Sequence, residues 1–500
     1  MSHTSEKSSR PWHQQLTAYK GVLLAVVSMA QLLDILNVSS VTIVLPSVMR
    51  DVGFKFDQLQ WVSSAYALAY GAFLLLGGRI GDLFGHRNIF LFGVIWFSIW
   101  SVVNGFAKTP VVMSIGRALQ GMGAGFTVPS ALAILTTTYP VGPERTKALG
   151  IFGGTAAFGS ILGMLLGGIL GSTIGWRWMF YITGIIGFAL SILGFLAIPP
   201  TVETRIIDRR VDVAGITTFT AGVVTFIYYL SEGPSAGWGS AKTLAPFIVG
   251  LVLLAVFVII QFKITYPIMP LHIWRSRRLV ASCASAACMM AALNSHFFFT
   301  SLVFQNILGY TPLKTSLCYI PHGVGVVLTI GFISKVVVQR VRSKIIIAVG
   351  WVFLIASGVV WAQTKVTSSY WALPFPALLL NMAATSCIWF CCQMNSVADA
   401  ADEDQGVVGA VYNVCLQVGA PIGIAIANII ADKHNKGIVA GPELMIGYRD
   451  AMYSFAAMAG LGLICTLLLN PNQDIVVGTS EDNDTESVAS QGKDEVSTIG

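Results

Sequence analysis

Charged residues are scarce in this chain of 500 residues. Asp, Glu, Lys and Arg make up 11% of it, hydrophobic residues make up 55%, and the mean hydropathy is +0.72. This composition excludes a water-soluble globule, because too few polar side chains are present to cover its surface. A nucleic-acid-binding protein is excluded too, since the basic residues are scattered over short loops. We therefore expect an integral membrane protein.

Motifs of enzymes, channels and ATP-driven pumps are also missing. The apolar segments contain no His-Glu-x-x-His, no Gly-x-Ser-x-Gly turn and no pair of aspartates. A repeated pore loop is absent, as is the Gly-rich loop that binds ATP. The eight cysteines lie mostly in apolar segments without metal-site spacing. We expect no catalytic residues, no cofactor and no metal.

Fourteen apolar segments are long enough to cross a bilayer as helices. A hydrocarbon layer of about 30 Å takes roughly 20 apolar residues, and each segment is bounded by Pro, Gly or charge. The predicted spans are 20–44, 59–78, 89–107, 111–137, 148–171, 179–198, 213–231, 244–262, 279–302, 315–337, 345–362, 372–394, 406–431 and 450–469.

Lysines and arginines predict the orientation of these spans. They are roughly twice as frequent on the side of both termini, which favours cytosolic termini. One loop on that side dissents, because Asp399, Asp402, Glu403 and Asp404 lie there without a cation. We expect no cleavable signal peptide, since residues 1–19 are polar and the first apolar run is too long.

Polar linkers divide the chain into seven parts. We predict a cytosolic segment 1–19, a six-helix bundle 20–198, a linker 199–212, a central helix pair 213–262, a linker 263–278, a second six-helix bundle 279–469 and a disordered acidic tail 470–500. An internal repeat supports the division, because Gly331 to Arg340 follows the second helix of its half as Gly78 to Arg87 does. Paired halves around a midplane cavity are the architecture of alternating-access carriers.

Asp34 is a carboxylate in the middle of the first predicted helix, where a charge costs roughly 2.5–3.5 kcal/mol on insertion scales. Gln31, Asp34, Asn37 and Val41 recur at helical spacing, so this face looks into the bundle. A buried carboxyl group can bind and release protons near working pH. Asp34 is therefore a candidate proton carrier, and a structural hydrogen-bonded aspartate is the alternative.

Arg117 is a cation placed well inside a predicted span. Gln120, Ala124 and Thr127 continue its polar or small face. A buried cation needs a partner, and Asp34 is the predicted counter-charge. An interhelix ion pair with a purely structural role is the alternative.

The segment Gly78 to Arg87 is a short Gly-rich hairpin between two predicted spans. A carboxylate such as Asp82 can cap a helix or bridge to cations across the contact between the halves. We predict a gate latch that stabilises the outward-open state. Turn chemistry explains the glycines Gly78, Gly81 and Gly85 equally well, but it does not explain Asp82 and Arg87 together.

Cargo contacts are expected from polar and aromatic groups at midplane depth, because pockets for organic molecules combine the two. For each candidate, an ordinary interhelix hydrogen bond or packing contact is the alternative. The candidates are Asn37, Gln120, Asn294, His296, Tyr319, Asn381, Asn413 and Gln417.

Four motifs together resemble the major facilitator superfamily, and within it the fourteen-span drug:proton antiporter family, over the chain to about residue 470. They are the hairpin motif with Gly78, Gly81, Asp82, Gly85 and Arg87, the fourth-helix motif Arg117 to Gly125, the first-helix signature Leu33-Asp34 with Thr42 to Pro46, and Trp176 to Phe180. The resemblance implies an all-α fold of two six-helix halves plus a central helix pair. It also implies a role for Arg117 in proton coupling.

The fifth helix is similar to the antiporter motif of that family. Its glycines are Gly153, Gly159, Gly163, Gly167 and Gly168. Met164 stands where the family has proline. Glycines four residues apart let helices approach closely, so simple packing is the alternative role.

The resemblance implies a secondary active transporter that exports a drug, toxin or secondary metabolite against proton entry. Its expected partners are small-molecule cargo, protons and the bilayer, without ATP or nucleic acid, and it is expected to be a monomer. A fungal plasma membrane is expected, with the vacuolar membrane as the alternative. Similar fungal carriers serve aminotriazole resistance, boron export and low-affinity ammonium movement, so a proton-coupled or facilitative carrier of borate or ammonium is the alternative function.

Overall fold

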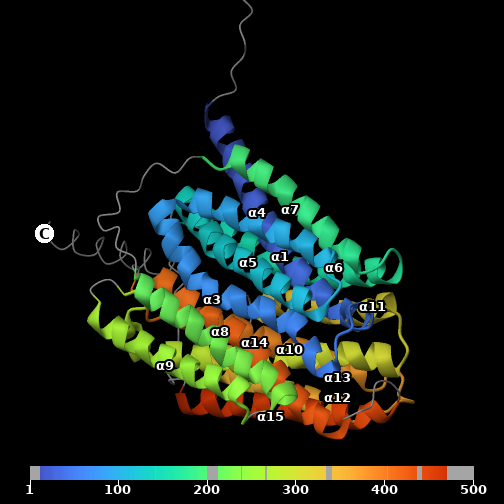
Figure 1. Cartoon of the computed structure of the whole chain (residues 1–500). Coiled ribbons are helices and arrows are strands. Elements are labelled where there is room, and N and C mark those ends of the chain that lie inside the picture. The colour runs from blue at the N-terminus through green and yellow to red at the C-terminus, as the bar shows by residue number, and fades with distance from the viewer. Residues whose placement is uncertain are drawn as a thin grey trace, which may run out of the picture.

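The architecture is all-helical throughout the part of the chain that the structure describes (Figure 1). This computed structural model describes residues 12–140, 142–199, 212–237, 239–264, 267–333, 341–401, 404–435 and 442–469. Most of the predicted linker 199–212, most of the second hairpin motif and the tail 470–500 lie outside these residues. Within them, fourteen helices reach twenty residues or more.

The long helices are α1 (Trp12–Val52), α3 (Trp61–Phe84), α4 (His86–Gly105), α5 (Pro110–Thr138), α6 (Pro143–Ser172), α7 (Arg177–Ala197), α8 (Val213–Ala236), α9 (Ala241–Lys263), α10 (Arg277–Leu302), α11 (Pro312–Phe332), α12 (Ser343–Ala362), α13 (Pro374–Val397), α14 (Gln405–Asn435) and α15 (Met445–Leu469). The short elements are α2 (Phe56–Leu59), η1 (Leu271–Arg275), η2 (Val303–Ile307) and η4 (Pro442–Leu444).

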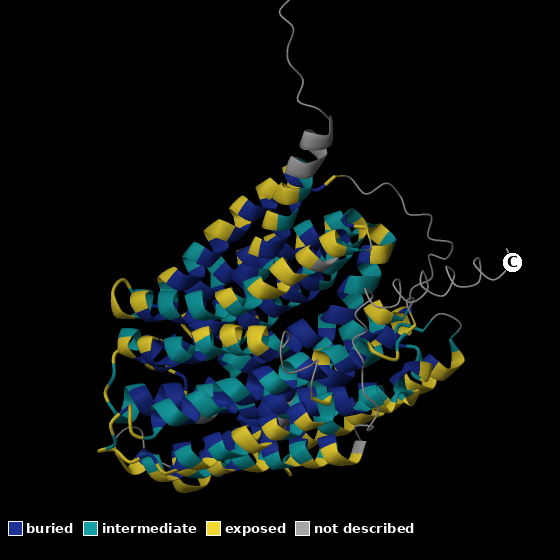
Figure 2. Ribbon diagram, turned by 180° about the vertical axis from the view of Figure 1, so that it is seen from behind, coloured by how far each residue is buried: buried dark blue, intermediate teal, exposed yellow. Residues whose placement is uncertain are grey.

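Thirteen helices of the described chain are long and apolar enough to cross a membrane. The remaining long helix is α8, whose described apolar part, Val213–Phe226, is shorter than a span. Exposed residues lie on the outward faces of the bundle (Figure 2), and the apolar ones among them include Phe262 and Leu196, which are 76% and 74% exposed. Such a surface fits contact with lipid, where the helical backbone satisfies its own polar groups.

Helix α1 is longer than the sequence predicted, because it continues through Pro46 to Val52. Proline lacks the N–H that would bond the carbonyl of Thr42, four residues earlier. That carbonyl accepts instead from the Ser301 hydroxyl at 2.9 Å, and the Ile43 carbonyl accepts from Gln305 Nε2 at 2.7 Å. A second helix therefore satisfies the backbone at the proline.

The predicted hairpin at 78–87 is wrong in extent. Helix α3 continues to Phe84 and α4 begins at His86, so Gly78, Gly81 and Asp82 lie in the last turns of α3. Only Gly85 leaves the helical conformation, with φ at +87°. Glycine adopts this left-handed backbone without strain, so a single residue makes the turn.

The helices pack in two similar sets. In the first, α1 packs on α6 and α4 packs on α5 and α7; in the second, α10 packs on α14 and α12 packs on α13 and α15. Between the sets, α6 contacts α11 and α14 contacts α3. The matching pairs give the two halves a two-fold relation. Helices α8 and α9 pack on each other, and α8 lies against α3 and α14.

Glycines bring corresponding helix pairs into backbone contact in both halves. A side chain at Gly159, Gly163 or Gly167 would strike the α1 backbone. A side chain at Gly419 or Gly423 of α14 would strike the α10 backbone in the same way. Close approach through small residues is the common packing device of membrane helices.

Candidate functional site

A cavity of about 250 Å³ lies between the two halves. Helices α1, α3, α5 and α6 line it from one half, and α10 and α14 line it from the other. Four of the residues predicted for proton coupling or cargo binding are among its lining residues. They are Asp34, Arg117, Asn294 and Gln417.

Asp34 is buried, with 4% of its surface exposed, at the wall that α1 contributes to this cavity. Its Oδ1 accepts a hydrogen bond from the hydroxyl of Tyr66 on α3. Its Oδ2 has no hydrogen-bond partner among the described residues. An unpaired buried carboxylate oxygen is costly, so Oδ2 is a favourable place for a proton.

Arg117 is 1% exposed and is held by three oxygen atoms. Its Nε donates to the Val62 carbonyl at 2.9 Å, and its Nη1 donates to Asn37 Oδ1 and to Gln120 Oε1, both at 2.7 Å. The guanidinium lies over the ring of Tyr66, with Cζ 4.4 Å from the ring centroid. These contacts fix the cation without a carboxylate in direct contact.

Asp34, the predicted counter-charge, is not among the atoms that hold Arg117 directly, and its role as counter-charge stays a prediction. Tyr66 contacts both side chains, through its hydroxyl to Asp34 and through its ring to Arg117. Helical spacing identified Asp34 and Arg117 in the sequence, but it could not show that Tyr66 contacts both. Tyr66 comes from a third helix, α3, and sequence spacing describes one helix at a time.

Asn37 and Gln120, which the sequence predicted as cargo contacts, serve as acceptors for Arg117. Neither is among the residues that line the cavity. Asn413 also lies outside the lining and donates to the Gly409 carbonyl of its own helix at 2.9 Å. These three amides make hydrogen bonds within the protein in this structure, and any contact of theirs with cargo stays a prediction.

His296, Tyr319 and Asn381 are buried in the second half and are not themselves among the lining residues. His322 Nε2 lies 3.0 Å from Asn381 Oδ1, and the Tyr319 hydroxyl donates to the Phe297 carbonyl at 3.2 Å. His296 packs against aromatic rings, with the ring of Phe455 at 5.1 Å. Any contact of this group with cargo stays a prediction.

Several lining residues were not predicted. Tyr66 and Tyr70 on α3 are four residues apart and share a face, a signal that was readable inside the span 59–78. The others are small or flexible side chains that carry no pattern of their own. They include Ser39, Ser63, Ser64, Ser160 and Met290.

The turn at Gly85 brings together most of the predicted gate residues. Asp82 Oδ1 lies 3.1 Å from His86 Nε2, and a side chain at Gly81 would collide with the His86 ring. Arg87 Nη2 donates to the Phe195 carbonyl of α7 at 2.7 Å. All these contacts stay within the first half, so the latch between halves stays a prediction.

The glycines of α6 do not share one environment. Gly159, Gly163 and Gly167 face α1, whereas Gly168 faces Ser316 of α11 in the other half. A side chain at Gly153 would meet nothing within 4 Å. Met164, at the position of the family proline, lines the cavity.

Polar contacts close the end of the cavity near Gly53. Besides the bonds from Ser301 and Gln305 to α1, the Leu313 N–H donates to Ser172 Oγ at 2.9 Å, and Asn428 Nδ2 donates to Gln60 Oε1 at 3.1 Å. Phe56 stacks on Tyr448 at 5.9 Å. We call these contacts the Gly53-end seal.

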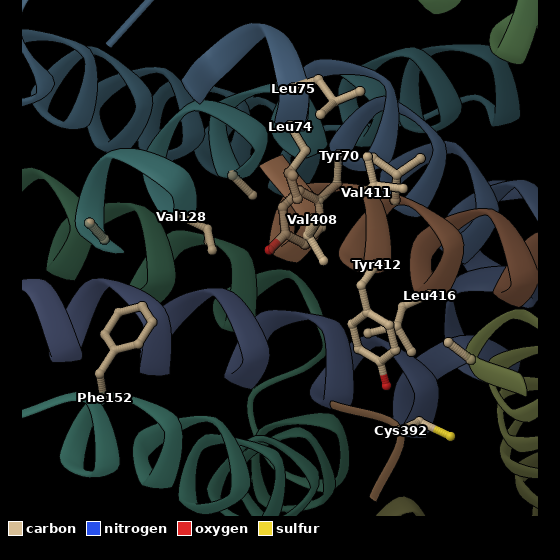
Figure 3. Packing of buried hydrophobic residues seen from close by; sticks show 14 of the residues in the cluster. Tyr70, Leu74, Leu75, Val128, Phe152, Cys392, Val408, Val411, Tyr412 and Leu416 are labelled. Carbon is tan, nitrogen blue, oxygen red and sulfur yellow. The ribbon is translucent and has the colours of Figure 1, made fainter. Parts of the chain in front are cut away.

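A buried apolar cluster joins α3 and α14 on the other side of the cavity. Tyr70, Leu74 and Leu75 of α3 belong to one buried cluster with Val408 and Val411 of α14, seen from close by in Figure 3. Apolar surfaces separate without leaving unpaired polar groups, whereas the seal has hydrogen bonds to break. The two ends of the interface thus differ in chemistry.

Two similar bundles with a central cavity between them are the architecture of a membrane carrier of small solutes. The chain belongs to the Major Facilitator Superfamily, whose family model matches residues 27–424. It is accordingly a multi-pass membrane transporter.

Several known relatives are transporters, and their names point to different compounds. The puromycin resistance protein pur8 of Streptomyces alboniger is 32% identical over 82% of this chain and 81% of its own. The multidrug transporter mfsC of Aspergillus fumigatus is 27% identical over 95% of this chain and 93% of its own. The low affinity ammonium transporter of Saccharomyces cerevisiae is 30% identical over 81% of this chain and 79% of its own.

Solved structures share the fold. The POT family transporter PepTSo has a TM-score of 0.67 at 16% identity, over 89% of this chain and 97% of its own. At this identity the likeness concerns the arrangement of helices alone.

Proposed function

We propose that this protein exports a small organic compound in exchange for protons. The observation that carries the proposal is the position of Asp34, a buried carboxylate with an unpartnered oxygen at the wall of the central cavity. Ionisable groups inside a membrane span are costly and mark proton and substrate pathways. Proton and cargo then bind at the same site, either in competition or in turn.

The cavity lining fits an amphipathic organic cargo. Tyr66, Tyr70, Phe297 and Phe298 contribute rings, Met290 adds a flexible thioether, and serine hydroxyls supply hydrogen bonds. Aromatic walls with a few polar groups are the usual lining of small-molecule pockets. The similarity to the puromycin resistance protein and to the multidrug transporter supports a cargo of this kind.

The distribution of Lys and Arg favours a cytosolic position for the Gly85 turn and for both termini. The Gly53-end seal then closes the outer side. In this scheme, cargo enters from the cytosol, the seal opens, and a proton from outside replaces the cargo. We place the protein in the plasma membrane.

Inside-out vesicles test the proposal. Their lumen corresponds to the outside of the cell, so an acid lumen drives puromycin, the probe compound, into vesicles that contain the protein. The variant Asp34→Asn should lose the dependence on the pH gradient, because it cannot carry the proton. Accumulation by Asp34→Asn that still follows the gradient would remove Asp34 from the proposal.

The second candidate function is carriage of a small polar solute such as ammonium or borate, favoured by the 30% identity to the low affinity ammonium transporter. The same vesicles, loaded with labelled methylammonium, distinguish the two. Gradient-driven uptake of puromycin without competition by ammonium supports the first function. Saturable methylammonium movement that puromycin does not inhibit supports the second.

A further inference from the structure

Tyr66 lies between the two buried ionisable groups of the site and contacts both. Its hydroxyl donates to Asp34 Oδ1, and its ring carries the Arg117 guanidinium on one face. The side chain is 2% exposed and contributes to the wall of the cavity. Three helices, α1, α3 and α5, therefore meet through one tyrosine.

This arrangement gives the two oxygens of Asp34 different tasks. Oδ1 is occupied by the Tyr66 hydroxyl, which donates best to the ionised carboxylate. Oδ2 has no partner within the described residues. A proton that arrives at Asp34 is expected to bind Oδ2, where it forms the O–H bond of a neutral acid while Tyr66 keeps its own proton.

The cation over the ring strengthens the donation. A guanidinium on the aromatic face withdraws electron density from the ring, so the hydroxyl hydrogen becomes more positive. Arg117 is fixed there by Val62, Asn37 and Gln120, and it does not leave to pair with Asp34 directly. Arg117 therefore acts on Asp34 through Tyr66.

We propose that Tyr66 is a positioning residue that holds Asp34 in its ionised form and so sets the pH at which the transporter exchanges protons. The proposal rests on the proposed function, because it concerns the proton that Asp34 carries. It also links the proton to a moving part. When Oδ2 is protonated, the hydrogen bond from Tyr66 weakens and α3 is held less firmly to α1.

Other titratable groups near α1 do not take this role. Tyr70 of α3 lines the same cavity, and its ring meets that of Tyr66 edge-on at 6.3 Å. The residues that α6 and α10 contribute to the cavity wall are Ser160, Met164, Met290, Leu293, Asn294, Phe297 and Phe298, none of which is charged.

The remaining groups are engaged elsewhere. On α7, Arg177 pairs with Asp51 at 3.3 Å near the Gly53 end. On α11, Lys314 lies over the ring of Tyr310, and the bonds of His322 to Asn381 and of Tyr319 to Phe297 are described above. On α10, His296 packs among aromatic rings.

The test is the pH profile of puromycin transport in vesicles, measured for Tyr66→Phe, Tyr70→Phe, Asp34→Asn and the double variant Asp34→Asn/Tyr66→Phe. Loss of a hydrogen bond to a charged group is expected to move the midpoint of Tyr66→Phe by about one pH unit toward alkaline pH. Tyr70→Phe, which removes a hydroxyl from the same helix, keeps the wild-type midpoint whatever its rate. The double variant behaves like Asp34→Asn.

The outcomes separate the two proposals. If Asp34→Asn keeps its pH dependence, the proposed function fails. If Asp34→Asn loses it but the midpoint of Tyr66→Phe does not move, or moves equally in Tyr70→Phe, the role of Tyr66 is overturned and the proposed function stands.

A substitution that preserves packing covers the case in which Tyr66→Phe does not fold. 3-Fluorotyrosine at position 66 keeps the ring and makes the hydroxyl a stronger donor. The midpoint should then move in the acid direction. An unchanged or alkaline midpoint would contradict the proposal.

Discussion

At the scale of single residues, the polar groups of the site satisfy only part of one another's hydrogen bonding. Arg117 could be recognised in the sequence because a cation deep in an apolar run is rare. Gln120 could also be placed on the face of Arg117, because it lies three residues further along the same helix. Val62 and Asn37 could not be recognised as partners, because they come from α3 and α1. Asn37 and Gln120 were predicted to meet cargo, and the structure shows them holding Arg117.

Replacement of Arg117 by alanine is expected to destabilise the protein by about 3 kcal/mol, because Asn37 Oδ1 loses its donor in a buried place and Gln120 Oε1 keeps only the bond from Asn104. Thermal unfolding of the purified protein in detergent measures the effect. The matched control is Arg177→Ala, which removes a partly exposed arginine at the Gly53 end. Equal losses in both variants would show that burial of Arg117 adds nothing.

At the scale of helices, the sequence shows the glycine spacing and predicts long helices, but it predicts the helix ends less accurately. Pro46 looked like the end of the first span, and the helix continues because Ser301 satisfies the carbonyl that proline leaves free. The glycines of α6 were expected to act in packing or in antiport. The structure separates Gly163, which meets α1, from Gly153, which meets nothing within 4 Å.

Gly163→Leu is expected to abolish transport and lower the yield of folded protein, since its side chain would fall on the backbone of α1 at Leu36. Gly153→Leu, two to three turns away on the same helix, should retain near wild-type transport. Vesicle uptake and monodispersity in detergent give the two readouts. A tolerated leucine at Gly163 would show that α1 and α6 are not packed this closely.

The acidic loop around Asp399 and Asp404, which lacks the Lys and Arg of the other loops on its side, also has a physical explanation at this scale. Asp399 accepts from Arg278 Nη1 and from Ser276 Oγ, each at 2.8 Å, and Asp404 Oδ2 lies 2.7 Å from His272 Nε2. The partners of these acidic residues lie in η1 and at the start of α10, where Arg278 supplies a cation. Acidic and basic residues far apart in the sequence therefore compensate each other at one end of the bundle.

At the scale of the whole molecule, the two halves are joined differently at their two ends. The Gly53-end seal consists of hydrogen bonds and stacked rings, whereas the other end is closed by the apolar cluster of α3 and α14. A carrier that alternates its access must break the seal in every cycle. The seal is thus the place where a covalent link between halves should stop transport.

A disulfide between Ser172→Cys and Leu313→Cys is expected to form and to stop transport by more than about tenfold. The 2.9 Å bond between Ser172 Oγ and the Leu313 N–H keeps the two Cα atoms within about 7 Å, the range that a disulfide spans. The experiment uses a chain without its eight native cysteines. Reduction should restore uptake, and each single cysteine should transport normally. Full transport in the cross-linked protein would exclude opening at this end.

The sequence by itself determined that the chain lies in lipid, the order of its apolar segments, and the family motifs. These depend on local composition and on the length that a helix needs to cross lipid. Only the tertiary structure decided which polar groups share the cavity, that Tyr66 stands between Asp34 and Arg117, and which end is sealed. Contacts between helices depend on how each helix is rotated and placed against its neighbours, and a pattern read along one helix does not contain that information.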